Sequence, residues 1–112
     1  MADCIFCRIA AGEAPARVVA EDDDVVAFED VRPQAPLHVL VIPRRHVAGV
    51  HEVAEDGLLG RLVATAGRVA VERGVAEDGY RLVVNAGADG GQEVLHLHLH
   101  LLAGRPMTWP PG

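Results

Sequence analysis

His96-Leu97-His98-Leu99-His100-Leu101-Leu102 is the stretch that decides the fold and the chemistry of this chain. On an extended strand successive side chains point to opposite faces, so the three imidazoles would share one face and the leucines the other. The leucine face is expected to cover the one long helix. Neither strand propensity nor burial favours histidine, so the other face is either a solvated polar surface or a functional site.

Distance limits what the three imidazoles can do together. Same-face neighbours on a strand lie about 6.7 Å apart and the outer pair about 13 Å apart. Because zinc holds nitrogen at about 2.0 to 2.1 Å, a straight strand cannot bring all three to one ion. At least one is therefore left for another role, and a row of imidazoles can supply a nucleophile, a proton donor and phosphate contacts.

Composition removes several classes of function. The chain has 112 residues and a formal net charge of -6; all ten basic residues are Arg, and Lys and Ser are absent. This excludes Ser-His-Asp hydrolysis, Lys Schiff-base chemistry and a P-loop. The acidic balance argues against nucleic acid as a partner. No targeting segment or membrane-spanning run is evident, so a cytoplasmic protein with no membrane partner is expected.

Apolar periodicity predicts one α+β domain over residues 1–112. A mainly antiparallel sheet with helices on one face is the simplest layer arrangement. The acidic run 21–24 is expected to be a solvated turn between two strands. Helices are predicted at 5–11 and 54–74, strands at 17–20, 25–28, 38–42, 80–85 and 94–102, and an irregular tail at 106–112.

Two further motifs leave alternatives open. Cys4 and Cys7 could be a redox pair, two metal ligands or two small buried side chains, because a structural zinc site needs four ligands and two are missing locally. The glycine-rich segment 85–92 could bring backbone N–H groups close to an anion, although a plain turn is the commoner explanation.

Taken together, these motifs resemble the histidine triad (HIT) superfamily, specifically its Hint branch. The resemblance spans nearly the whole chain. It implies the HIT fold: a five-stranded sheet with one long and one short helix, continued edge to edge across a homodimer. The stretches that carry it are residues 3–7, 28–30, 33–38, 42–46, Gly90-Gly91-Gln92, the histidine run itself and the terminal Trp109-Pro110-Pro111-Gly112.

The resemblance implies a hydrolase that cleaves nucleoside 5′-phosphoramidates at the α-phosphorus. His98 would be the nucleophile that forms a nucleotidyl-histidine, with His100 and His38 as phosphate-contacting partners. The ligand would be a purine nucleoside monophosphate or its amidate. Phosphate would be held by Asn85, Gly91, the Glu93 backbone, His98 and His100; ribose and base would be held by Asp30, Ile5, Phe6, Ile9, Phe28 and Val31.

The same resemblance implies structural zinc on Cys4, Cys7, His46 and His96, with no cofactor needed for catalysis, and leaves His51 exposed. One position departs from the pattern: Hint phosphoramidases often carry Ser where this chain has Glu93, which puts protonation of the departing amine in question. Two alternatives remain, a nucleotide-binding adaptor with slow incidental hydrolysis and a dinucleoside polyphosphate hydrolase.

Overall fold

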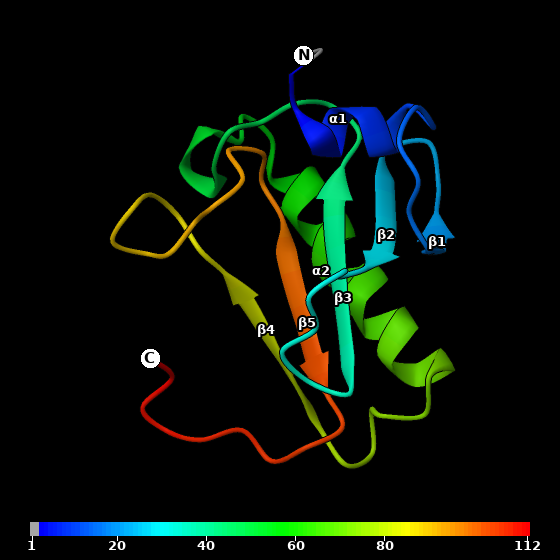
Figure 1. The fold of residues 1–112 in the computed structure, drawn as a ribbon, viewed down its shortest axis with the longest axis vertical. Coiled ribbons are helices and arrows are strands. Elements are labelled where there is room, and N and C mark those ends of the chain that lie inside the picture. The colour runs from blue at the N-terminus through cyan, green and yellow to red at the C-terminus, as the bar shows by residue number, and fades with distance from the viewer. Residues whose placement is uncertain (1–2) are drawn as a thin grey trace.

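A computed structural model describes residues 3–112 of the chain (Figure 1). It contains two α-helices, one short 3-10 helix and five strands within that range. Their bounds, in chain order, are α1 Ile5–Ala10, β1 Val18–Glu21, β2 Val25–Glu29, β3 Leu37–Pro43, the 3-10 helix η1 Val50–Glu52, α2 Asp56–Glu72, β4 Tyr80–Val84 and β5 Leu99–Ala103.

The strands form one sheet in the order β1-β2-β3-β5-β4, and every neighbouring pair is antiparallel. The expected α+β architecture is therefore confirmed. The histidine-bearing strand β5 lies between β3 and β4, with His100 opposite Leu40 and Leu102 opposite His38. This register places the histidine of β3 close to the last histidine of the run.

The leucine face of the histidine run packs on α2, as predicted. Leu97, Leu99 and Leu101 join one buried cluster with apolar side chains of α2, including Leu58 and Leu62. The amphipathic pattern of the 17-residue helix α2 provides the complementary apolar stripe. The core thus packs against the leucine face of β5, and the histidine face of the sheet lies away from α2.

The expectation that both helices cover one face of the sheet is wrong. Phe6 of α1 packs in a second cluster with Val26, Phe28, Leu40 and Ile42, whose side chains alternate with those that face α2. Alternation along β2 and β3 makes these the opposite face. The short helix α1 therefore covers part of the histidine face, while α2 lies behind the sheet (Figure 1).

The predicted last strand is shorter than expected. Strand β5 begins at Leu99 rather than at residue 94, although residues 95–98 keep the leucine–histidine alternation of the sequence. The last pair of the ladder with β3 is Val41 with Leu99, and two positions further along Leu97 would lie opposite Pro43. Proline has no backbone N–H to donate, and the ladder ends before this position.

The other predicted elements are present with shifted ends. Helix α2 begins two residues later and ends two residues earlier than expected, and Gly74 follows it in the left-handed region at φ +73°. The helix η1 was not predicted. The acidic turn forms as expected, with Asp22 Oδ1 accepting hydrogen bonds from the backbone N–H groups of Asp24 and Val25. Within residues 3–112 no helix is long and apolar enough to cross a membrane.

Candidate functional site

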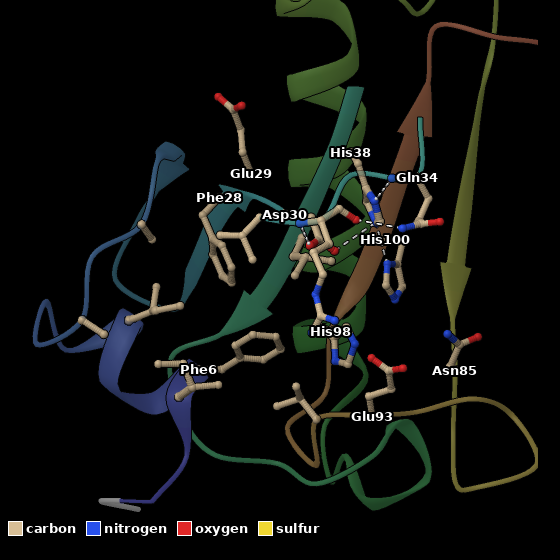
Figure 2. A pocket seen from close by; sticks show the side chains of 18 of the residues that line it. Phe6, Phe28, Glu29, Asp30, Gln34, His38, Asn85, Glu93, His98 and His100 are labelled. Atoms are coloured by element: carbon tan, nitrogen blue, oxygen red, sulfur yellow. Dashed lines mark hydrogen bonds and ion pairs between the residues drawn. The ribbon is translucent and has the colours of Figure 1, made fainter. Parts of the chain in front are cut away.

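A cavity of about 710 Å³ opens on the histidine face of the sheet (Figure 2). It brings together every residue predicted to contact a nucleotide. These residues come from α1, β2, β3, β5 and two loops. They are Ile5, Phe6, Ile9, Phe28, Asp30, Val31, His38, Asn85, Gly91, Glu93, His98 and His100. We call this cavity the histidine pocket.

One end of the histidine pocket is apolar. The rings of Phe6 and Phe28 are buried and meet edge to face, with centroids 5.5 Å apart. Phe6 also lies edge-on to His98, with centroids 5.1 Å apart. Ile5 and Val31 are exposed at the rim. The aromatic residues therefore both belong to the core and form the cleft wall.

The hydrogen bonds of His98 define its tautomer. Its Nδ1 lies 2.7 Å from the carbonyl oxygen of His96, and a carbonyl can only accept, so this nitrogen carries the hydrogen. In the neutral ring Nε2 is then the unprotonated nitrogen with a free lone pair. The buried ring of His98 lines the histidine pocket, so it offers a fixed imidazole in the nucleophilic form.

A second chain of hydrogen bonds fixes His38 and His100. The backbone N–H of Gln34 donates to His38 Nδ1 at 3.0 Å, so His38 carries its hydrogen on Nε2. That nitrogen lies 2.9 Å from His100 Nδ1, which accepts it. The hydrogen of His100 is therefore on Nε2. This atom is buried and has no hydrogen-bond partner among residues 3–112.

The orphaned N–H of His100 points to a missing acceptor. Buried polar groups are nearly always hydrogen-bonded, and a lone donor beside a cavity indicates a ligand atom that completes it. In Figure 2 the free nitrogen of His100 points into the space bordered by His98, Glu93 and Asn85. A phosphoryl oxygen in that space would accept this hydrogen while its phosphorus faced His98.

Burial keeps two of these imidazoles neutral. It lowers the pKa of His100 to about 4, with the neighbouring His98 and His38 acting in the same direction and Asp30 against them. The pKa of His38 is also lowered by burial, again opposed by Asp30. At neutral pH both rings are uncharged, which is what the donor chain from Gln34 to His100 requires.

Asp30 lies at the edge of the same network. Its Oδ1 accepts the backbone N–H of Arg32 at 2.9 Å, and its Oδ2 lies 3.4 Å from His38 Nε2. The carboxylate follows β2 and reaches into the histidine pocket between the apolar end and the histidines (Figure 2). A carboxylate there can accept two hydroxyl donors at once.

Asp30, His38 and His100 also come close enough to share a metal ion, since their ligand atoms lie within 4.8 Å of one another. The tautomers oppose this use. A metal on His38 Nε2 would move the hydrogen to Nδ1, where it would face the N–H of Gln34. Two donors would then meet without an acceptor, which is costly in a buried site. We therefore assign no metal to this set.

The glycine-rich loop borders the histidine pocket through Asn85 and Gly91. Gly91 has φ +80°, a conformation that other residues rarely adopt, and a Cβ atom at Gly90 would collide with the Ala86 carbonyl oxygen. The side chain of Gln92 holds the loop by bonding to Gly87 N, Ala48 O and Val94 O. The loop is therefore a fixed structure.

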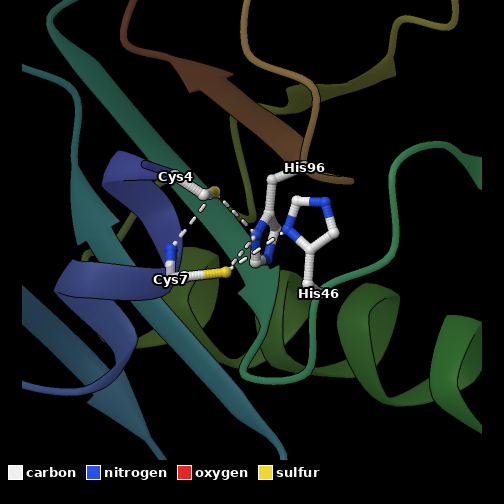
Figure 3. A group of neighbouring side chains, drawn as sticks. All are labelled: Cys4, Cys7, His46 and His96. Carbon is white, nitrogen blue, oxygen red and sulfur yellow. Dashed lines mark hydrogen bonds between the residues drawn. The ribbon is translucent and has the colours of Figure 1, made fainter. Parts of the chain in front are cut away.

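A separate cluster lies at the start of α1 (Figure 3). Cys4, Cys7, His46 and His96 place four ligand atoms within 4.8 Å of one another; we call them the cysteine–histidine cluster. The sulfur of Cys4 lies 3.3 Å from His96 Nδ1, and the sulfur of Cys7 lies 3.3 Å from His46 Nδ1 and 3.5 Å from His96 Nδ1. Sulfur and nitrogen bound tetrahedrally to one zinc ion would lie about 3.6 Å apart, so the spacing fits.

The proton positions fit a metal as well. His96 Nε2 lies 2.8 Å from the carbonyl oxygen of Pro43 and must donate to it, which leaves Nδ1 unprotonated toward the two sulfurs. Burial, together with the neighbouring Cys4 thiol, raises the pKa of Cys7.

Comparison with known proteins supports the same grouping. A family model described as the HIT domain matches residues 11–107. The chain belongs to the HIT domain family. The purine nucleoside phosphoramidase of Escherichia coli is 46% identical over 107 residues, which cover 94% of this chain and 90% of the enzyme. A HIT family hydrolase from Legionella pneumophila has a TM-score of 0.95 at 53% identity, covering 98% of this chain and all of that one.

A third relative bears on the cysteine–histidine cluster. A zinc-bound histidine triad family protein from Mycobacterium smegmatis has a TM-score of 0.84 at 32% identity, over 93% of this chain and 76% of that one. Thus the expected HIT fold and family are confirmed, and a zinc-bound member shares the fold. His51 is exposed, as expected, and pairs with Glu52.

Sequence reasoning missed two residues that position the HIT site. Gln34 matters through its backbone N–H, which sets the tautomer of His38, and Gln92 matters through its grip on the glycine-rich loop. Gln34 lies in a proline-punctuated segment, a signal for a rigid turn that could have indicated a positioning role. No sequence signal reports which backbone N–H will meet a histidine nitrogen.

Proposed function

We propose that this HIT protein is a nucleoside phosphoramidase that hydrolyses the P–N bond of nucleoside 5′-phosphoramidates. One observation carries the proposal: the free lone pair of His98 and the orphaned N–H of His100 border the same cavity. A nucleophile and a phosphate-oxygen donor held in fixed tautomers are what transfer of a nucleotidyl group needs. The similarity to the E. coli phosphoramidase supports the choice of substrate.

The proposed reaction has two steps. His98 Nε2 attacks the α-phosphorus, the N–P bond to the protein forms as the substrate P–N bond breaks, and the amine leaves with a proton taken up from solvent. Water then attacks the phosphorus, the bond to His98 breaks with its electron pair returning to Nε2, and one proton of the water returns to solvent. Nucleoside monophosphate is released and the neutral imidazole is regenerated. His100 and His38 would hold the phosphoryl oxygens, with Asn85, Gly91 and the Glu93 backbone completing the phosphate contacts, while Asp30 would bind the ribose hydroxyls.

The experiment compares two substrates on one protein preparation. Adenosine 5′-phosphoramidate and a diadenosine polyphosphate are assayed for release of AMP, and acid-quenched samples are searched by mass spectrometry for AMP bound to His98. We expect a faster reaction with the amidate and a labelled His98. Faster cleavage of the polyphosphate would favour the dinucleoside hydrolase. Tight binding of AMP with negligible turnover of either would favour the adaptor.

We further propose structural zinc on the cysteine–histidine cluster. The four donors have the spacing and the proton positions of a closed Cys₂His₂ site, and a zinc-bound relative shares the fold. Such an ion would cross-link α1 to the loop after β3 and to the segment before β5. Metal analysis of protein purified without a His-affinity column should give about one zinc per chain.

We also propose a homodimer in which two sheets join along β4. This strand forms one edge of the sheet, and Tyr80 and Val84 on it are exposed, as is Val63 on α2. Pairing two β4 edges would satisfy their open backbone groups. Trp109 is 82% exposed and does not line the histidine pocket of its own chain, so the tail is free to reach the partner's site. Light scattering should give twice the chain mass, and Val84→Asp should shift it toward the monomer.

A further inference from the structure

Glu93 is a carboxylate at the histidine pocket that the proposed reaction does not use. It is exposed, it lines the histidine pocket, and its carboxylate makes no hydrogen bond or ion pair within residues 3–112. Other acidic side chains near the pocket are engaged: Glu29 pairs with Arg73 at 3.7 Å, and Asp30 accepts from the Arg32 backbone. A carboxylate without a partner at the pocket interacts electrostatically with any charged group that binds beside it.

The arrangement of the pocket determines which part of a bound nucleotide would lie beside Glu93. Phe6 and Phe28 lie on one side of His98, while Asn85 and Glu93 lie on the other (Figure 2). A nucleotide with its base in the aromatic cleft and its phosphorus beside His98 leaves one direction for the remaining phosphorus substituent. That substituent, the leaving group, extends into the space bordered by Asn85 and Glu93.

The charge around this space is negative. The chain has no lysine, and the pocket is lined by one arginine, Arg32, against the three acidic residues Glu29, Asp30 and Glu93. Under the proposed function, phosphate contacts would come instead from neutral donors such as His100 Nε2. A leaving group that carries negative charge would therefore be repelled near Glu93, and one that carries an ammonium would be attracted.

We propose that Glu93 is a specificity-determining residue that selects leaving groups by charge, favouring amines that carry a second, cationic group and disfavouring anionic ones. This rests on the proposed function for the direction of binding and deepens it by naming the leaving-group class. It also predicts poor use of polyphosphates, whose leaving group is multiply anionic.

The test uses three adenosine 5′-phosphoramidates of matched length. Their amines are 1,2-diaminoethane, propylamine and β-alanine, so the terminal group is cationic, neutral or anionic. We expect kcat/KM in the order cation, neutral, anion at low salt, with about a tenfold ratio between the extremes that shrinks as ionic strength rises. Glu93→Gln should lower this ratio at least threefold, and Glu93→Asp should retain it.

A matched control separates local from global charge. Glu77→Gln removes an exposed carboxylate in the turn after α2, remote from the histidine pocket, and should leave the ratio unchanged. An equal ratio in wild-type and Glu93→Gln protein would overturn the proposal. So would a fall of the same size in Glu77→Gln.

A binding measurement makes the result independent of turnover. In His98→Ala protein the dissociation constants of the same three amidates are measured by calorimetry, with and without Glu93→Gln. The charge order should appear in the first protein and shrink in the second. If no amidate is hydrolysed by wild-type protein but this order holds, the phosphoramidase proposal fails and the role of Glu93 stands. If hydrolysis is fast and the order is absent, the phosphoramidase proposal stands and the proposed role of Glu93 fails.

Discussion

The first and last histidines of one seven-residue stretch belong to different kinds of site. His96 is fully buried, and its Nδ1 faces the sulfurs of Cys4 and Cys7. His100 belongs to the histidine pocket and leaves its Nε2 without a partner. His98 lies between them and joins the two, since its Nδ1 donates to the carbonyl oxygen of His96. Histidine thus occurs both in a cluster where each ring nitrogen of His96 has a partner and in a pocket where one ring nitrogen of His100 has none. The hydrogen-bond partners determine the role that each histidine can take.

This contrast predicts that the two regions respond differently to mutation. Changes in the histidine pocket should mainly alter activity, because His98 and His100 present a free lone pair and an unpartnered N–H to the cavity rather than to each other. Changes in the cysteine–histidine cluster should mainly alter stability, because its groups are arranged for one another.

The largest expected effect is on His98, the proposed nucleophile. His98→Ala should lower kcat on adenosine 5′-phosphoramidate by at least about 10³-fold, because no other imidazole among residues 3–112 borders the same space with a free lone pair. AMP binding measured by calorimetry should persist. In His98→Gly, added imidazole should restore part of the activity. Full activity in His98→Ala would eliminate the assignment.

Next comes loss of the cysteine–histidine cluster. Cys4→Ala/Cys7→Ala should lose bound zinc and lower the free energy of unfolding by more than about 3 kcal/mol, because a metal that binds only the folded chain stabilises it. Urea titration with metal analysis measures both. His51→Ala is the control, since this exposed histidine is outside the cluster and should change neither.

A smaller effect is expected in the pH dependence of stability. His100 has a folded pKa of about 4, below its ordinary value near 6.5, so the unfolded chain binds this proton more readily between these values. The stability it contributes is present above pH 6.5 and is lost as pH falls toward 4. His100→Asn should reduce the change in unfolding free energy over this range by about 2 kcal/mol. An unchanged pH profile in the variant would contradict the assignment.

The smallest expected effect is that of the cysteine–histidine cluster on activity in the histidine pocket. Removing zinc from wild-type protein with a chelator should lower kcat about tenfold while KM changes less, because His96 supplies the carbonyl that holds His98. Re-adding zinc should restore kcat. If apoprotein that is still folded by circular dichroism has full activity, the two regions are independent.

Sequence reasoning reached most of the fold because the strongest patterns were periodic. The alternation in residues 96–102 and the apolar stripe of α2 each dictate which face is buried, and both faces are as predicted. The start of β5 was not predictable from alternation, which reports an extended backbone and not the presence of a pairing partner. The side of the sheet taken by α1 was missed because a six-residue helix does not reveal which apolar surface it covers.

For the site, the sequence predicted which residues come together but not the hydrogen bonds that orient them. Every nucleotide-site residue named from the sequence lines one cavity, and all four cluster residues meet. The tautomers could not be foreseen, because they depend on the Gln34 N–H and on the carbonyls of Pro43 and His96. These backbone groups have no side-chain signature, and their positions follow only from the folded chain.

Pro43 has a consequence for anyone who would transplant this chemistry to another sheet. It ends the pairing beside β5, and its carbonyl, left outside that ladder, orients His96. A histidine run grafted onto a strand whose neighbour continued would be held in a regular ladder, with its imidazoles evenly spaced along one face. The graft would copy the alternating sequence, but it would not copy the separation of the cysteine–histidine cluster from the histidine pocket. The graft would need a neighbouring strand that stops early.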